Sequence, residues 1–137
     1  MFGTAIEKGR MDAAGSKAAM NSILVVDDEF DSRRALEILL ELHGFEVTPA
    51  ANGEEALRIL RSRKFDIILT DWMMPVMSGQ ELLSRLQTEN IAAGSPVVVL
   101  TAAAEVVSSL EPACARVIGK PFDIRSLLST IEELLAH

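Results

Sequence analysis

Four short apolar runs in this chain each end at a polar side chain. Short runs of β-branched and aliphatic residues are typical of strands that are buried on both faces of a sheet. A charged group at the end of such a strand is costly to bury unless an opposite charge or hydrogen-bond partners meet it. The runs and the polar residues that follow them are 23–26 with Asp27 and Asp28, 67–70 with Asp71, 97–100 with Thr101, and 117–119 with Lys120.

From residue 22 onward, strand-like runs alternate with stretches of helical periodicity. This alternation predicts an α/β fold built on a parallel sheet. Asn52, Ser78 and Asp123 are expected to cap helices, because their side chains can accept hydrogen bonds from free backbone N–H groups. The expected strands are 22–26, 46–50, 67–70, 97–100 and 116–118, and the expected helices are 31–43, 53 onward, 79 onward and 124–136. The stripe of helix 31–43 expected to be buried is Ala35, Leu36, Leu39, Leu40 and Leu42.

The order of the strands can also be predicted. Proline has no N–H to donate to a ladder, so Pro49 places the second strand at an edge of the sheet. The fifth strand is short and carries Arg116, which favours the other edge. Five parallel strands in the order 2-1-3-4-5, with helices on both faces, make a doubly wound, flavodoxin-like sheet. In that order Asp27, Asp28 and Asp71 fall at the carboxyl ends of neighbouring strands.

Length and charge limit the function classes. At 137 residues the chain has room for one domain, which we place at 21–137, with 1–20 as a poorly structured tail or leader. A net charge of −7 argues against direct binding to nucleic acid. Cys114 is the single cysteine, and no apolar run is long enough for a membrane helix, so we expect a cytoplasmic protein without membrane contact. The sequence is compatible with a homodimer as well as with a monomer.

The strand-end residues suggest a chemistry of their own. If the strands are parallel, three carboxylates, a hydroxyl and an ammonium group gather at one edge of the sheet. Carboxylate oxygens are ligands that Mg²⁺ prefers, and a cation offsets the mutual repulsion of the acids. Such a set can hold a divalent cation and accept a phosphoryl group.

These residues resemble the receiver domain of two-component response regulators over about 22–137. The motifs that carry the resemblance are Asp27-Asp28, Asp71 with Met74-Pro75 and Gly79, Thr101-Ala102, and Lys120-Pro121-Phe122. The resemblance implies that Asp71 accepts a phosphoryl group from a phosphohistidine. It also implies a Mg²⁺ site and a phosphoryl-binding set. The Mg²⁺ ligands would be Asp27, Asp28, Asp71 and the backbone carbonyl of Met73, and the phosphoryl group would meet Thr101, the backbone N–H of Ala102, and Lys120.

The same resemblance implies the partners and the output. A sensor histidine kinase or a histidine phosphotransfer protein would supply the phosphoryl group, and a downstream protein would read the modified state. The domain would be a signalling domain and not an enzyme, with self-phosphorylation and self-dephosphorylation as its chemistry. A cis bond between Lys120 and Pro121 is expected on the same basis.

The chain departs from the family pattern in two places. The stretch from Thr101 to Lys120 is about one helical turn short, so we expect a shortened helix near 104–110. Val117 stands where the family usually has an aromatic residue that turns inward on activation. Thr101 and Val117 are therefore expected to be the switch positions, with a relay that differs from the usual one.

Three alternative functions share parts of this sequence pattern. A pseudo-receiver would bind partners without being phosphorylated, and the altered 104–110 region motivates that hypothesis. A Mg²⁺-dependent phosphatase of the haloacid-dehalogenase type would need a second acid two residues after its nucleophile, where Met73 stands after Asp71. A flavodoxin-like binder of flavin mononucleotide would need a phosphate-binding loop after the first strand, which this chain lacks.

Overall fold

The computed structural model describes residues 10–11, 17–18, 20–105 and 116–136. Within them lies a five-stranded parallel sheet in the order β4-β3-β5-β6-β7. The predicted order 2-1-3-4-5 is therefore confirmed, with Pro49 on an edge strand. The strands are β3 (Ser22–Val26), β4 (Glu46–Ala50), β5 (Ile67–Asp71), β6 (Val97–Thr101) and β7 (Arg116–Gly119). A separate antiparallel pair joins β1 (Arg10–Met11) and β2 (Lys17–Ala18).

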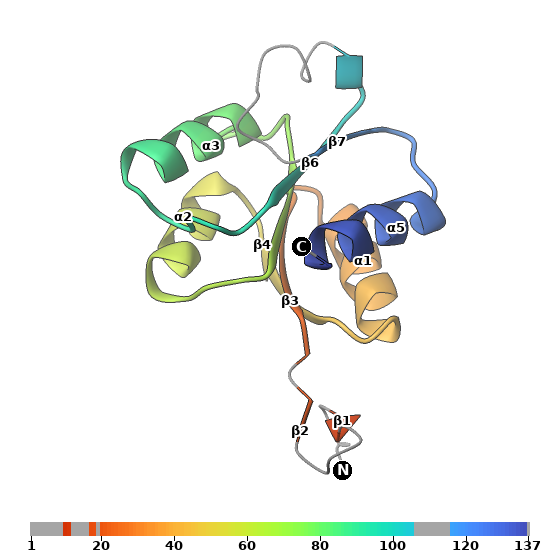
Figure 1. The fold of residues 1–137 in the computed structure, drawn as a ribbon. Coiled ribbons are helices and arrows are strands. Elements are labelled where there is room, and N and C mark those ends of the chain that lie inside the picture. The colour runs from red at the N-terminus through yellow and green to blue at the C-terminus, as the bar shows by residue number, and fades with distance from the viewer. Residues whose placement is uncertain (1–9, 12–16, 19, 106–115, 137) are drawn as a thin grey trace.

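Helices cover both faces of the sheet (Figure 1). α1 (Phe30–Leu42) and α5 (Ile124–Leu135) lie on one face, and α2 (Gly53–Ser62) and α3 (Gly79–Thr88) lie on the other. Each face has its own apolar core, because alternate residues of a strand point to opposite sides. In β3, Leu24 and Val26 join the α2–α3 core, whereas Ile23 and Val25 join the α1–α5 core.

The three predicted helix caps are confirmed. The backbone N–H of Glu55 donates to Asn52, that of Glu81 to Ser78, and that of Ser126 to Asp123. The Glu81 side chain also accepts from the backbone N–H of Ser78, which completes a capping box. These caps fix where α2, α3 and α5 begin, and α3 begins eight residues after Asp71.

The predicted buried stripe of α1 is wrong in part. Leu36 and Leu40 are buried, but Ala35, Leu39 and Leu42 are exposed, Leu42 to 74%. α1 packs over β3 and the edge strand β4, so only a narrow stripe of the helix meets the sheet. Ala35 and Leu39 instead line an open groove of about 650 Å³, together with Pro121, Phe122 and Ile124.

The Lys120–Pro121 peptide bond is cis, as predicted. The shortened helix expected near 104–110 falls largely on residues outside those described. Within the described ranges, no helix combines the length and the apolar character needed to cross a bilayer.

Candidate functional site

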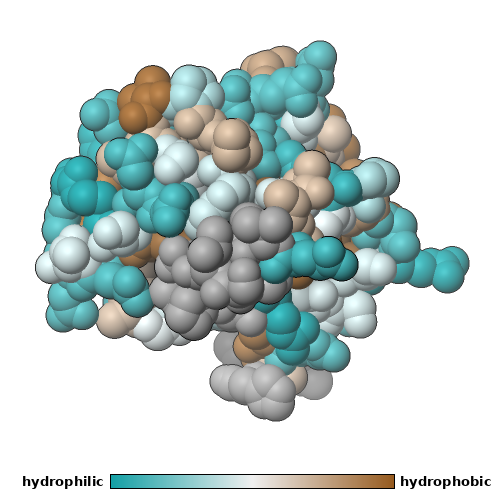
Figure 2. Space-filling view, turned by 90° about the horizontal axis from the view of Figure 1, so that it is seen from above, coloured by the Kyte–Doolittle hydropathy of each residue, from teal (hydrophilic) through white to brown (hydrophobic). Residues whose placement is uncertain are grey.

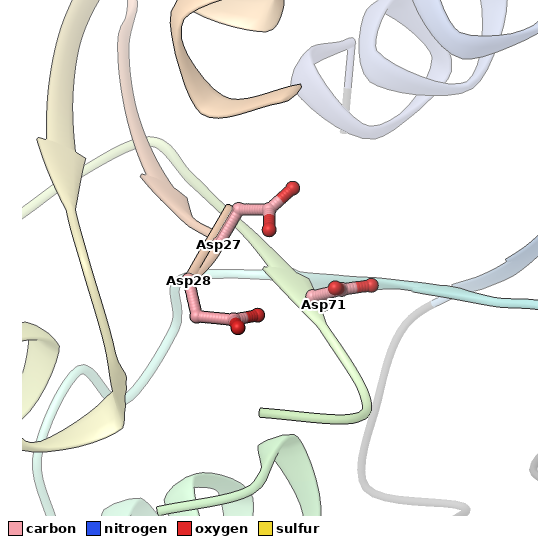
Figure 3. Close-up of side chains that lie close together, drawn as sticks. All are labelled: Asp27, Asp28 and Asp71. Carbon is pink, nitrogen blue, oxygen red and sulfur yellow. The ribbon is translucent and has the colours of Figure 1, made fainter. Parts of the chain in front are cut away.

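Three carboxylates meet where β3 and β5 end (Figure 3). Asp27 and Asp28 follow β3 directly, and Asp71 is the last residue of β5. Each of the three offers an oxygen, and these oxygens lie within 4.8 Å of one another. Asp27 is buried, Asp71 is half-buried and Asp28 is exposed, so the cluster opens to solvent on one side. Oxygen donors at this spacing fit a hard divalent cation.

Asp27 is the acid most affected by its surroundings. Its residue surface is only 3% exposed. Burial raises the pKa of the Asp27 carboxyl group above its usual value of 3.8, and the negative charges of Asp71 and Asp28 act in the same direction. The backbone N–H of Glu29, 3.0 Å from Oδ1, and the charge of Lys120 oppose that rise in the pKa. A cation in the cluster would stabilise the charged form of the Asp27 carboxyl group.

Lys120 supplies the positive charge nearest to Asp71. Its Nζ lies 2.6 Å from Asp71 Oδ1, and about a third of its side chain is exposed. The backbone N–H of Lys120 donates to the carbonyl of Thr101 at 2.8 Å, which ties the end of β7 to the end of β6. The lysine therefore reaches Asp71 from a backbone fixed by the sheet.

Thr101 ends β6 and is buried. Its Oγ1 accepts a hydrogen bond from the backbone N–H of Ala103 at 3.1 Å, so its own hydroxyl hydrogen can be donated elsewhere. Ala102, whose backbone N–H was predicted to bind the phosphoryl group, lies between Thr101 and Ala103 and is exposed. Thr101 pairs with Gly119 across the sheet, and half-buried Val117 packs against the α2–α3 core.

The loop after Asp71 is fixed by close backbone contacts. Trp72 is buried, and its N–H donates to the carbonyl of Leu100 at 3.0 Å. The N–H of Gly79 donates to the carbonyl of Trp72 at 2.8 Å. A Cβ at Gly79 would lie 2.6 Å from the backbone oxygen of Asp71, closer than real Cβ contacts. Only glycine fits here without a shift of the backbone, so Gly79 allows the start of α3 to pack against the backbone of Asp71 and Trp72.

The role of Gly79 in this packing was not predicted from the sequence, although the residue was part of a motif. A signal was available, because a glycine directly after a helix cap is a poorer helix former than alanine. Met73, by contrast, was predicted to offer its carbonyl to the metal ion, and this residue is 74% exposed on the loop that follows Asp71. Viewed from the end at which the strands finish, hydrophobic side chains lie scattered among hydrophilic ones (Figure 2).

Comparison with known proteins gives a consistent result. The family model for the response regulator receiver domain matches residues 23–132. The phosphate regulon transcriptional regulatory protein PhoB of Pseudomonas aeruginosa is 37% identical over 117 residues, which are 83% of this chain and 51% of that protein. The chain spans about half the length of the curated relatives it matches.

Two solved structures that resemble this fold contain magnesium. The response regulator TrrA from Thermotoga maritima, in complex with Mg²⁺ and BeF, is 33% identical with a TM-score of 0.77, covering 85% of this chain and 100% of that one. The receiver domain of a Pseudomonas aeruginosa sensor histidine kinase, with a magnesium ion coordinated in its active site cleft, is 25% identical. Its TM-score is 0.80, and the match covers 87% of this chain and 100% of that one.

Proposed function

Because this chain belongs to the response regulator receiver domain family, we propose that Asp71 accepts a phosphoryl group and that this modification changes which proteins the domain binds. The observation that carries the proposal is the 2.6 Å contact between Lys120 Nζ and Asp71 Oδ1 inside a cluster of three carboxylates. The Lys120 ammonium group offsets the charge of the neighbouring carboxylates and lies where it could also meet an anionic group added to Asp71.

The proposed reaction is a simple group transfer. A carboxylate oxygen of Asp71 attacks the phosphorus of a phosphohistidine on a sensor kinase or a histidine phosphotransfer protein. The new P–O bond forms as the P–N bond breaks, and the electron pair of that bond returns to the imidazole, which then takes a proton. The product on this chain is an aspartyl phosphate. Asp71 is suited to this role because it is half-buried and still reachable from solvent.

The neighbouring side chains would hold the transferred group. The Lys120 ammonium can follow the negative charge from the Asp71 carboxylate to a phosphoryl oxygen. The Thr101 hydroxyl has its hydrogen available for another phosphoryl oxygen. Positioning and charge neutralisation of this kind supply most of the catalysis in phosphoryl transfer.

The acid cluster is suited to Mg²⁺. Asp27, Asp28 and Asp71 would hold the ion with the carbonyl of Met73, since these are the hard oxygen donors that Mg²⁺ prefers. When bound, the ion neutralises the carboxylates and the incoming phosphoryl oxygens. Without it, Lys120 is the one cation that contacts a carboxylate of this cluster among the described residues.

The output would come from local rearrangement. Phosphorylation adds roughly −1.5 to −2 charges and strong acceptor oxygens. Thr101 and Lys120 lie at the ends of adjacent strands, joined by one backbone hydrogen bond, so their movement toward the phosphoryl group would alter the β6 and β7 edge together. Val117 lies on the same edge and is too small to copy the rotation of an aromatic ring. A downstream protein that contacts this edge would read the change.

The test is phosphorylation by a small donor. Wild type and Asp71→Asn are incubated with acetyl phosphate and Mg²⁺, and the intact masses are compared. We expect a phosphoryl adduct on wild type and none on Asp71→Asn. Asp123→Asn is the matched control, because asparagine caps α5 as well as aspartate does and lies outside the cluster. Absence of an adduct on folded wild type would contradict the proposal and favour a binding module that works without phosphorylation.

A further inference from the structure

Arg33 contacts the peptide bond that joins the two neighbouring acids. Its Nη1 donates to the backbone carbonyl of Asp27 at 2.8 Å, and that carbonyl belongs to the peptide between Asp27 and Asp28. The guanidinium also lies 5.4 Å from the centre of the Phe30 ring, within range of a cation–π contact. We propose that Arg33 is a positioning residue, which holds this peptide so that both carboxylates point toward Asp71.

The turn that carries the acids is held at three points. The N–H of Asp27 donates to the carbonyl of Ala50 at 3.1 Å, and Asp27 Oδ1 accepts from the N–H of Glu29 at 3.0 Å. Arg33 holds the third point, the Asp27 carbonyl. The first bond fixes the backbone of Asp27, and the second closes a turn from Asp27 to Glu29 that has Asp28 at its centre. Arg33 holds the plane of the peptide between the two acids, and the direction in which the Asp28 side chain leaves the backbone depends on that plane.

The first turn of α1 makes Arg33 available for this contact. Glu29 is the N-cap of α1, and its side chain makes no capping bond to the helix. The N–H of Arg33 donates to the carbonyl of Glu29 at 3.0 Å, which starts the helix and places the arginine side chain back over the turn. Phe30, a residue that is 64% exposed, packs its ring near the same guanidinium group.

The charge of Arg33 and its hydrogen bond predict opposite effects on the binding of a divalent cation. Arg33 is a cation at the edge of an acid cluster, so removing its charge alone should strengthen the binding of a divalent cation. Loss of the hydrogen bond to the Asp27 carbonyl should weaken that binding, because the carboxylates would no longer be held toward one another. The sign of the change in affinity therefore separates a positioning residue from a bystander charge.

The inference rests on the cation site proposed above, and Mg²⁺ binding tests it directly. Trp72 is the only tryptophan, is buried, and follows Asp71, so its fluorescence can report Mg²⁺ titrated into the metal-free protein. We expect Arg33→Ala to weaken Mg²⁺ binding about tenfold, as loss of a group that orients a metal ligand commonly does. Arg33→Lys, which keeps a donor and the charge, should recover part of the affinity.

Arg34→Ala is the matched control. It removes the same charge one residue along the same helix, where Arg34 is half exposed and pairs with Glu37 at 2.9 Å. Its Mg²⁺ affinity should match that of wild type or be slightly higher. Equal affinities of Arg33→Ala and Arg34→Ala, or tighter binding by Arg33→Ala, would overturn the inference.

Two further measurements keep the outcomes distinct. Urea unfolding of the metal-free proteins shows whether Arg33→Ala still folds. If it does not, Phe30→Ala decides the matter, because loss of an exposed ring leaves the core intact and should still weaken Mg²⁺ binding; unchanged affinity there would overturn the inference. Wild type that binds no Mg²⁺ at all would instead count against the cation site itself.

Discussion

At the residue scale, the absence of a side chain at Gly79 allows close packing against the backbone of Asp71, the residue that we propose is phosphorylated. Alanine at this position would bring its Cβ within 2.6 Å of the Asp71 backbone oxygen. Because that neighbour is backbone, the loop must shift, and overpacking of this kind costs about 1–3 kcal/mol. We therefore expect Gly79→Ala to lower the free energy of unfolding in urea and to slow phosphorylation of Asp71 by acetyl phosphate.

Gly94→Ala serves as the control for Gly79→Ala. Gly94 has a φ of +90° and nothing within 4 Å of an added Cβ, so alanine there is strained without a clash. It should cost about 1–2 kcal/mol in stability. Phosphorylation of Asp71 should be unchanged in Gly94→Ala, and equal slowing in both variants would show that stability alone accounts for the effect.

Val76 carries backbone strain in the loop that follows Asp71. Its φ is 70°, and the N–H of Met77 donates to the carbonyl of Pro75 at 2.7 Å, which makes a tight three-residue turn. A β-branched residue is poorly suited to this conformation. Val76→Gly should raise the free energy of unfolding by about 0.5–1 kcal/mol, the relief of strain being partly offset by the entropy of glycine. Asn90→Gly, at a φ of 53°, should gain less because asparagine tolerates this region.

At the scale of single elements, the start of α3 can be tested through its cap. Ser78 accepts from the N–H of Glu81 at 3.1 Å, so Ser78→Ala leaves that donor without its partner. We expect a loss of about 1 kcal/mol in the free energy of unfolding, followed by circular dichroism in urea. Ser84→Ala makes the same change on the exposed side of the same helix and should have no cost, since alanine is the better helix former.

The elements also show which features a sequence can reveal. Pro49 identified an edge strand correctly because the missing N–H is a property of the residue itself. The exposure of Leu39 and Leu42 was not predicted, because periodicity gives the face that residues share but not how much of that face the sheet covers. The contact of Arg33 with the Asp27 carbonyl was missed for a similar reason, since it depends on the shape of a turn.

The acid cluster was predictable because the strand ends meet at one edge whatever the details of packing. Asp27, Asp28, Asp71 and Lys120 were therefore placed together from strand order alone. Their unequal burial was not predictable in that way. It depends on tertiary packing that strand order does not fix, and it leaves Asp27 buried while Asp28 is exposed.

At the scale of the whole molecule, Asp27 couples stability to pH. Because the pKa of this carboxyl is raised in the folded state, the folded protein holds its proton more tightly than the unfolded chain does. The contribution of Asp27 to stability is therefore fully present below pH 3.8, the ordinary pKa of this group. It is lost as the pH rises through the higher pKa of the folded state. We expect metal-free Asp27→Asn to be more stable than wild type at pH 7, with a smaller difference near pH 4, as measured by urea midpoints.

Magnesium should reverse this dependence on pH. The ion binds deprotonated carboxylates, so its affinity and the stability it adds should rise with pH. With free Mg²⁺ at 100 times its Kd, the folded state gains about 2.7 kcal/mol. Wild type should then be more stable than Asp27→Asn at pH 7, the opposite of the metal-free order, whereas Glu132→Gln, at an exposed site on α5, should respond to Mg²⁺ as wild type does. An unchanged order of stabilities in saturating Mg²⁺ would mean that Asp27 is not a ligand of the ion.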